Sequence, residues 1–410
     1  MKLRYLILSA AALTMVACSE DSLDSQSIFS NTTQTPQNDF DKWLQKNYVE
    51  PYNIDFKYRF EYKESDTKYN LVPADYDKAI ALAKLTKYLW LEPYEELMGK
   101  DFIRTYAPKV MNLIGSPAYD GNGGLVLGTA EGGMKIVLYN VNNINPDKLD
   151  MDFLNEWYFN TMHHEFAHIL HQTKAYPTDF NEISKADYQS SSWVNLTDEE
   201  ALAMGFVNNY ASAETREDFV QTIAFYITLS DEAWEELLDQ AIVEVTDENG
   251  DPVYELDSKG NPILVTDENG DPVPATDPYG RIIYQRDEYG NYIWETDEKG
   301  NFIFETDEEG NRIPMTDSNG NIIYQTTDEG DIVYDKDGNP VPEYWKIPVP
   351  EYEKEIMKDY SGYDKIQQKL AMVKEYLDYF WGIDLDELHR IVQERQAKVA
   401  AGELDLKSLN

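Results

Sequence analysis

The chain has 410 residues, of which 42% are apolar, and its 76 acidic residues outnumber 35 basic ones to give a net charge of −41. This length and apolar content suffice for a buried core and argue against wholesale disorder. Nucleic acid is excluded as a partner, because phosphate binding requires clustered lysine and arginine. The single cysteine, Cys18, has no other cysteine in the chain with which to form a disulfide.

Residues 1–18 have the pattern of a signal peptide. A basic start, MKLR, precedes a short apolar run over residues 5–16, which is too short to span a bilayer as a permanent helix. The run ends in small residues before Cys18, and this resembles a bacterial lipoprotein signal in which the cysteine is lipidated and becomes the mature N-terminus. The alternative is a secretory signal with a chance cysteine.

Residues 19–39 are polar and predict a flexible tether. The acidic residues just after Cys18 resemble the surface-export signal of Bacteroidota lipoproteins. We therefore expect an outer-membrane lipoprotein that is held by a lipid anchor in the membrane and is exposed at the cell surface.

Residues 40–160 mix strand and helix patterns. Alternation over residues 52–62 predicts a strand, and residues 75–91 have the apolar spacing of a helix. Residues 123–141 predict two strands joined near Gly132-Gly133. Strands thus precede the next segment, which is predicted to be helical.

The stretch TMHHEFAHILHQ, residues 161–172, holds four of the chain's five histidines. On a helix, His164 and His168 lie on one face, where two neutral imidazoles can bind one zinc ion. Glu165 is next to them and can accept a proton from the attacking water. A chance meeting of these residues on an ordinary helix is the alternative. His163 and His171 are interpreted as residues behind the ligands or at the rim of the site.

A catalytic zinc site takes three protein ligands, so one must come from elsewhere. Residues 197–212 predict a helix with a capping box, and a second helix follows from about residue 215. Glu217, at its start, is the favoured third ligand, with Asp218 and His389 as weaker candidates. An acid at a helix N-terminus is also favoured by the helix dipole alone. Gln221 could orient a histidine ligand through a hydrogen bond.

Residues 243–343 form an acidic array with a ten-residue period, marked by glycines at 250, 260, 270, 280, 290, 300, 310, 320 and 330. The unit T-D-E-x-G-N is typical of turns, and the residues between suit short strands. We predict an inserted meander of about nine short strands, some of them weakened by prolines. Its acidic loops could bind Ca²⁺, but solvated turn residues are the preferred interpretation. Residues 344–410 predict the helical C-terminal part of the catalytic domain.

Several segments together resemble a known family. They are HEFAHILHQ, then Trp193, then EALAMGFVNNYASAETREDFVQTIA, and finally KLAMVKEYLDYFWGIDLDEL. They resemble the gluzincin class of zinc metallopeptidases and, more narrowly, the zinc-binding metallopeptidase lipoproteins of Bacteroidota, also described as substrate import-associated zinc metallohydrolases. The resemblance covers residues 40–240 and 345–400 and leaves the array outside.

This resemblance implies an α+β, zincin-like domain with a small mixed sheet, an active-site helix and a helical C-terminal part. It implies His164, His168 and Glu217 as ligands of one catalytic Zn²⁺ and Glu165 as general base. It also implies a role for Tyr210, whose hydroxyl would hydrogen-bond the oxyanion; an ordinary aromatic residue is the alternative. At Gln221 the chain departs from such families, which often carry an acid there.

The combined prediction is a lipid-anchored zinc metallopeptidase that hydrolyses peptide or protein substrates, with residues 40–242 as its main catalytic region. By analogy, a strand near residues 134–140 is expected to pair with an extended peptide. The rival prediction is a non-catalytic, accessory zinc-binding lipoprotein associated with an outer-membrane nutrient import complex.

Overall fold

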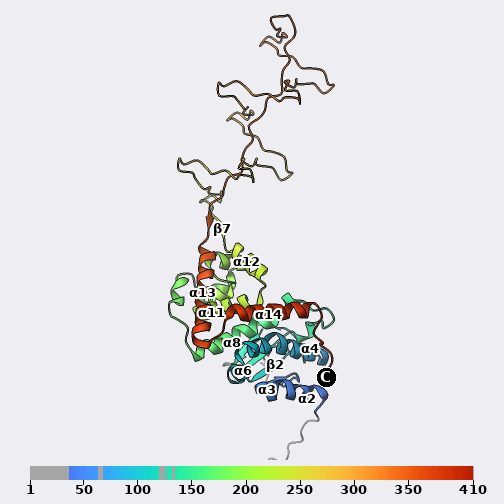
Figure 1. Cartoon of the computed structure of the whole chain (residues 1–410), viewed down its shortest axis with the longest axis vertical. Coiled ribbons are helices and arrows are strands. Elements are labelled where there is room, and N and C mark those ends of the chain that lie inside the picture. Colours follow the sequence, from blue (N-terminus) through green and yellow to red (C-terminus); the bar gives the residue numbers. More distant parts are fainter. Residues whose placement is uncertain (1–36, 63–67, 120–124, 127, 132–133, 410) are drawn as a thin grey trace, which may run out of the picture. The chain divides into compact units, whose positions relative to one another are not determined.

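The structure, a computed structural model, describes residues 37–62, 68–119, 125–126, 128–131 and 134–409. The predicted signal with Cys18, most of the predicted tether, and Gly132-Gly133 lie outside the described residues. The chain forms two compact units, the first made of Met1–Asp239 and Asp364–Asn410 and the second of Gln240–Tyr363 (Figure 1). Within the described ranges, no helix is long and apolar enough to cross a membrane.

The first unit opens with a helix in three parts, α2 (Asp39–Leu44), η1 (Gln45–Val49) and α3 (Glu50–Tyr52). It begins with a capping box, in which the side chains of Asn38 and Asp41 each accept a hydrogen bond from the other's backbone N–H. It ends at Asn53, whose left-handed backbone (φ 57°) stops the helix. The apolar side chains Phe40, Trp43 and Leu44 are buried.

The predicted helix over residues 75–91 is confirmed and continues beyond its predicted end. It comprises α4 (Tyr76–Thr86), the π-helical turn η3 (Lys87–Leu91) and α5 (Glu92–Met98). Gly99, with φ of 83°, ends it, and α6 (Lys100–Tyr106) follows.

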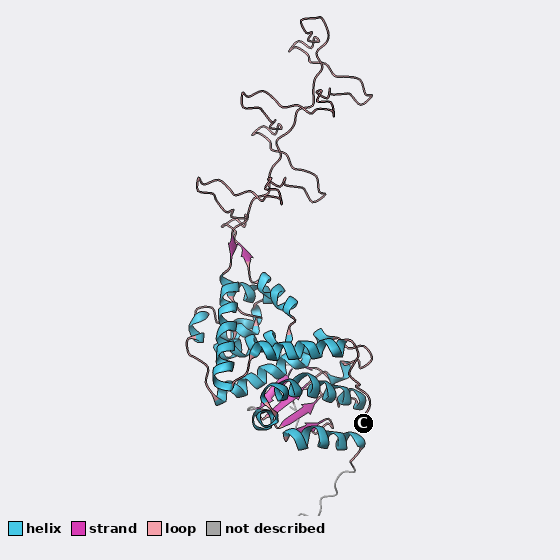
Figure 2. Ribbon diagram, in the orientation of Figure 1, coloured by secondary structure: helices cyan, strands magenta, loops and turns pink. Residues whose placement is uncertain are grey.

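A small mixed sheet has the strand order β1-β2-β6-β5. Figure 2 shows strands of the first unit as magenta arrows among the cyan helices. Its strands are β1 (Asp55–Lys57), β2 (Val110–Leu113), β5 (Gly128–Glu131) and β6 (Lys135–Leu138). Strands β1, β2 and β6 are parallel to one another, whereas β5 is antiparallel to β6. The predicted pair of adjoining strands within residues 123–141 is therefore confirmed. A separate antiparallel pair is formed by β3 (Ala118–Tyr119) and β4 (Leu125–Val126).

The position of β6 corrects one expectation. β6 lies between β2 and β5, so both of its edges are already paired. The prediction that the strand near residues 134–140 pairs with a peptide substrate is wrong, because an inner strand has no free edge to offer.

Helices dominate the chain between the sheet and the second unit. They are η4 (Val141–Asn143), α7 (Met151–Leu154), η5 (Asn155–Phe159), α8 (Asn160–Thr173), α9 (Phe180–Ile183), η6 (Ser190–Asn195), α10 (Asp198–Met204), η7 (Tyr210–Ser212), α11 (Thr215–Thr228) and α12 (Asp231–Gln240). The capping box predicted within residues 197–212 is present at the start of α10, where Thr197 and Glu200 form it. The predicted helix near residue 215 is α11, and its apolar side chains Phe219, Val220, Ile223 and Ile227 are buried.

The C-terminal part is helical from Ser361 onward, as α13 (Ser361–Trp381) and α14 (Leu385–Ala400). Within the first unit, α14 packs against α11 and α5. Residues 344–357, which the sequence assigned to this helical part, instead pair with the repeats of the second unit. Their alternation of proline, aromatic and charged residues excludes a helix, because each proline lacks the N–H that a helix requires.

The second unit has an organisation that differs from the predicted meander. Beyond the short strands β7 (Val243–Glu244) and β8 (Lys358–Asp359), its pairing consists of isolated β-bridges. Residues 340–357, here called the return segment, run antiparallel past nine consecutive repeats, from the bridge of Tyr334 with Pro340 to that of Tyr254 with Ile356. Each ten-residue repeat therefore pairs with two residues of this segment.

The spacing explains where prolines occur. Odd-numbered residues of the return segment donate their backbone N–H to the repeats and accept one in return, as Ile347 does with Ile303 and Glu295. Even-numbered residues make neither bond to the repeats, and the segment's prolines at 340, 342, 348 and 350 all occupy even positions. The prolines of the repeats, at 252, 262, 272, 274 and 314, occupy positions whose counterparts in the other repeats donate no backbone N–H. The expectation that these prolines weaken some of the strands is thus wrong, because they fall where no N–H is needed.

The repeated aspartates close the turns. In the turn at Asp297, Oδ1 accepts the backbone N–H groups of Lys299 and Asn301, and Oδ2 accepts the side-chain amide of Asn301. Gly300 has a φ of 82°, which the turn requires and which glycine adopts without strain. These bonds account for the aspartates as turn residues, while Ca²⁺ at the array stays an untested prediction.

Candidate metal centre

Two packed helices, α8 and α11, carry the predicted ligands. His164 and His168 are four residues apart on α8, and their ring centroids lie 4.7 Å apart. Glu217 stands in the first turn of α11. The opposite sides of these helices are apolar, with Phe166 and Leu170 of α8 and Ile223 of α11 buried. Core packing thus brings the two helices together, and the ligands follow from it.

The three side chains converge on one point. Nε2 of His164 lies 3.1 Å from Nε2 of His168, and Oε2 of Glu217 lies 3.2 Å from the first and 3.3 Å from the second. Ligand atoms that bind a tetrahedral zinc ion at about 2.0–2.1 Å lie about 3.3 Å from one another. The observed triangle therefore has the size that zinc requires, and this group could hold a metal ion.

The hydrogen bonds behind the rings explain why a cation belongs there. Nδ1 of His164 lies 3.2 Å from Oε1 of Gln221, an atom that can only accept, so Nδ1 carries the proton and Nε2 presents a lone pair. Nδ1 of His168 is engaged on its far side by Nε2 of His171 at 2.8 Å. Two ring nitrogens and a carboxylate oxygen thus face one another at distances where a proton or a cation must lie between them, because bare lone pairs repel.

Glu217 is ionised. Burial acts to raise its pKa, but its contacts with His164 and His168 outweigh burial and lower the pKa below the ordinary glutamate value. An ionised carboxylate beside two imidazoles is the donor set typical of catalytic zinc.

Glu165 lies between the two histidine ligands along α8. The sequence predicts that Glu165 transfers a proton. It is half-buried, and burial raises its pKa, while the charge of His168 acts in the opposite direction. A raised carboxyl pKa suits a group that accepts a proton and later returns it.

Tyr210 lies next to the ligands, as its predicted role requires. Its ring is 6.0 Å from that of His164 and is packed edge-on against Trp193 at 4.9 Å. Burial first, and then the charge and hydrogen bond of Glu217, raise the pKa of Tyr210. The hydroxyl therefore keeps its proton at neutral pH and remains a donor.

The weaker ligand candidates lie elsewhere. Asp218 is fully buried, with Oδ2 at 2.7 Å from Nζ of Lys369 and from the hydroxyl of Tyr188. His389 is held by the backbone oxygen of Tyr226 and by Asp231. Both residues have partners away from the site, so neither is placed to bind the metal.

The two remaining histidines of α8 have different surroundings. His163 is fully buried, its Nδ1 lies 2.9 Å from the hydroxyl of Tyr94, and burial lowers its pKa to about 3. His171 contacts His168 directly, so it lies behind a ligand. The sequence left open whether His171 lies behind the ligands or at the rim of the site. The three-residue spacing of His168 and His171 already predicts this contact, because residues three apart on a helix are neighbours.

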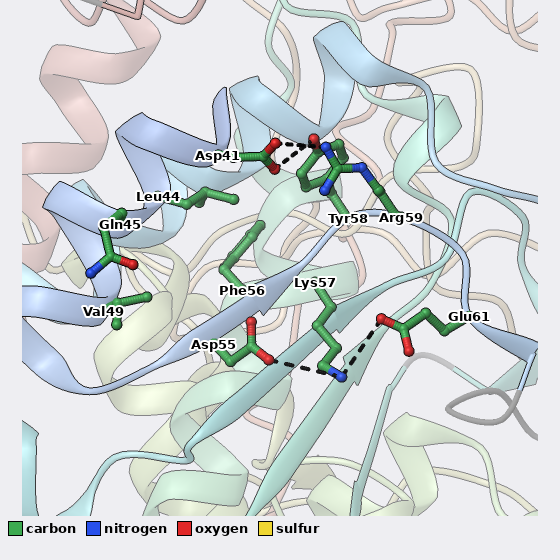
Figure 3. Close-up of a pocket in the computed structure, with 10 residues that line it drawn as sticks. All are labelled: Asp41, Leu44, Gln45, Val49, Asp55, Phe56, Lys57, Tyr58, Arg59 and Glu61. Atoms are coloured by element: carbon green, nitrogen blue, oxygen red, sulfur yellow. Dashed lines mark hydrogen bonds and ion pairs between the residues drawn. The ribbon is translucent and has the colours of Figure 1, made fainter. Parts of the chain in front are cut away.

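A pocket of about 230 Å³ lies apart from this cluster, between α2–η1 and β1 (Figure 3). Its charged side chains are engaged with one another. Asp41 pairs with Arg59 at 2.6 Å, and Lys57 lies 3.8 Å from both Asp55 and Glu61. None of its lining residues belongs to the His–His–Glu cluster.

The fold and the cluster define a metal-binding domain with a His–His–Glu centre carried by two neighbouring helices. Residues 32–264 match the family described as "Putative zinc-binding metallo-peptidase". A crystal structure of "a putative zinc-binding metallo-peptidase" from Bacteroides caccae is also similar, with 30% identity and a TM-score of 0.55 over 94% of this chain and 100% of that chain. A comparison with curated proteins gives no match. The chain belongs to this family of zinc-binding metallo-peptidases.

Proposed function

We propose that the chain is a zinc-dependent peptidase that hydrolyses peptide bonds. The observation that carries the proposal is the convergence of Nε2 of His164, Nε2 of His168 and Oε2 of Glu217 within 3.1–3.3 Å of one another. The family to which the chain belongs supports the same conclusion. When bound, zinc supplies a Lewis acid that polarises the scissile carbonyl and favours ionisation of water.

In the proposed mechanism Glu165 is the general base. Its carboxylate takes a proton from the attacking water, and the resulting carboxylic acid gives that proton to the leaving amine, so Glu165 ends the cycle as it began. Burial raises the pKa of Glu165, which makes its carboxylate a stronger base than an exposed glutamate and favours uptake of the proton from water.

Tyr210 is the proposed donor to the oxyanion. Its protonated hydroxyl lies near Glu217 in the free protein, and a hydrogen bond aimed at the developing negative charge stabilises the transition state more than the substrate. Trp193 packs against the ring and limits its movement.

The test uses the full chain and a proteome-derived peptide library. We expect the wild-type protein to cleave the library. Cleavage should stop when a chelator is added and resume when zinc is added back. Glu165→Gln is expected to keep zinc but lose hydrolysis. If the wild type shows no chelator-sensitive cleavage while zinc is bound, the accessory zinc-binding lipoprotein replaces the peptidase as the better account.

We also propose that the mature chain is lipid-anchored through Cys18 in the outer membrane and faces outward. The signal pattern of residues 1–18 and the acidic residues after Cys18 support this proposal. Cys18→Ala should move the protein from the membrane fraction to the soluble fraction, and retention in the membrane would contradict lipidation. Association with an import complex stays a prediction from the family resemblance.

A further inference from the structure

We propose that His171 is a positioning residue for the metal centre, which holds the ring of His168 so that Nε2 faces His164 and Glu217. The inference rests on the proposed zinc site. It goes beyond the ligand set, because it assigns the orientation of one ligand to a histidine that does not reach the metal.

The geometry carries the first step. Nε2 of His171 lies 2.8 Å from Nδ1 of His168, on the side of that ring opposite to Glu217. The two residues are three apart on α8, so the helix itself brings them together. This contact holds Nδ1 of His168 towards His171, and Nε2 of the same ring then faces His164 and Glu217.

The proton between the two rings can belong to either one. When Nε2 of His168 presents a lone pair to a cation, its Nδ1 carries the hydrogen and donates to Nε2 of His171. His171 must then be neutral and accept. The bond therefore selects the tautomer of His168 that binds metal, a task that is more often performed by a carboxylate or a backbone carbonyl.

The surroundings of His171 hold it in place. Only 6% of the residue is exposed, and its ring lies 5.5 Å from that of Tyr176 and 6.2 Å from that of Phe219. Tyr176 and Phe219 stack on each other at 4.3 Å. Since Phe219 belongs to α11, two residues after Glu217, the same packing fixes His171 and the helix of the third ligand.

Both ligand histidines are thus oriented by uncharged groups. Oε1 of Gln221 accepts from Nδ1 of His164, and Nε2 of His171 would accept from Nδ1 of His168 when a cation binds Nε2 of His168. A neutral acceptor makes an imidazole less electron-rich than a carboxylate does, which leaves a bound cation more strongly electrophilic.

The experiment compares four substitutions in the full chain by zinc affinity, measured by competition with a chelator. His171→Phe keeps the ring and removes the acceptor, and His171→Asn keeps an acceptor that is too short to reach Nδ1 of His168. His171→Gln places an acceptor at nearly the same distance as Nε2. His163→Phe is the matched control, since His163 is buried on the same helix and contacts Tyr94.

We expect His171→Phe and His171→Asn to weaken zinc binding about 10–100-fold, the usual effect of losing the partner of a ligand histidine. His171→Gln should restore affinity close to that of the wild type, and His163→Phe should leave it unchanged. Wild-type affinity in both His171→Phe and His171→Asn would overturn the inference and leave the zinc site standing. A wild-type chain that binds no zinc would overturn the proposed function itself.

Discussion

Nε2 of His168 lies 3.3 Å from Oε2 of Glu217, although 49 residues separate the two along the chain. The contact exists because α8 and α11 pack against each other while the apolar side of each helix is buried in the core, so core packing sets the position of the metal centre. Glu217→Gln keeps the size of the side chain and removes its charge. We expect zinc affinity to fall by more than about 100-fold, beyond the effect of losing an outer partner.

The control for that substitution is Glu214→Gln, three residues earlier in the chain. Glu214 is exposed and pairs with Arg216 at 2.7 Å, so its loss should leave zinc affinity unchanged. Chelator competition measures both variants. Equal affinity in Glu217→Gln and the wild type would remove Glu217 from the ligand set.

Asp218, the neighbour of Glu217, should affect stability and not zinc. Its carboxylate is buried and lies 2.7 Å from Nζ of Lys369, which is itself buried. Asp218→Asn leaves the lysine without its counter-charge, and breaking such a pair costs about 3–5 kcal/mol. Urea denaturation should show this loss of unfolding free energy, while zinc affinity of the folded protein stays the same.

A partly exposed ion pair provides the comparison. Asp187 lies 2.9 Å from Nζ of Lys365, and both side chains reach solvent. Asp187→Asn should therefore cost less than about 1 kcal/mol. Similar losses of unfolding free energy in Asp187→Asn and Asp218→Asn would mean that burial does not determine how strongly the Asp218 pair stabilises the protein.

Tyr210→Phe tests the oxyanion donor. Removing one such donor lowers kcat by about 10²–10³-fold, and KM should change little because the bond strengthens only in the transition state. Steady-state kinetics on a cleaved peptide provides both constants. Tyr188→Phe, which removes a hydroxyl bonded to Asp218, serves as the control and should retain the wild-type kcat. An unchanged kcat in Tyr210→Phe would make Tyr210 an ordinary packing residue.

The repeat array predicts a matched deletion. Because each repeat pairs with two residues of the return segment, removing residues 296–305 alone shifts the segment out of register with the remaining repeats. A further deletion of Lys346 and Ile347 should restore the register. Hydrogen exchange of the return segment should show lost protection in the first variant and recovery in the second. Equal protection in the two variants would contradict the two-residue register.

The array should also lose stability in acid. Hydrogen bonds from the Asn301 side chain and from backbone N–H groups lower the pKa of Asp297, and the equivalent aspartates are likewise lowered. An aspartate whose pKa is lower in the folded than in the unfolded state stabilises the fold at pH values above the unfolded-state pKa, which is about 3.9. This stabilisation is lost as the pH falls below that value towards the folded-state pKa. Circular dichroism and hydrogen exchange below about pH 4 should reveal it.

One repeat already contains the control for this acid effect. Thr327 occupies the aspartate position and accepts the backbone N–H of Asp331 through its uncharged hydroxyl. Threonine at the aspartate positions should flatten the pH dependence of array unfolding. If the variants unfold at the same acid pH as the wild type, the carboxylates are not the cause.

The metal centre could be predicted from sequence because its signals are local. His164 and His168 are fixed by helical spacing, and Glu217 lies in the first turn of a helix whose apolar stripe shows which way it faces. The contact of His171 with His168 was also within reach of the helical spacing. Which side of the His168 ring it would contact depends on Phe219 and Tyr176, whose positions follow only from tertiary packing.

The array and the sheet were predicted less well for a related reason. The turn chemistry of D-E-x-G-N is local and was recognised, and the structure shows those turns. The partner of each repeat is a segment up to 102 residues away, as in the bridge of Tyr254 with Ile356, which no local pattern encodes. The inner position of β6 likewise depends on β2, 22 or more residues earlier in the chain.

The most direct test of the central claim is the position of zinc in a crystal of the zinc-loaded chain, measured by anomalous scattering on both sides of the zinc absorption edge. We predict one strong peak within about 2.0–2.2 Å of Nε2 of His164, Nε2 of His168 and a carboxylate oxygen of Glu217. Zinc bound elsewhere in the chain, with these three side chains unliganded, would contradict the account.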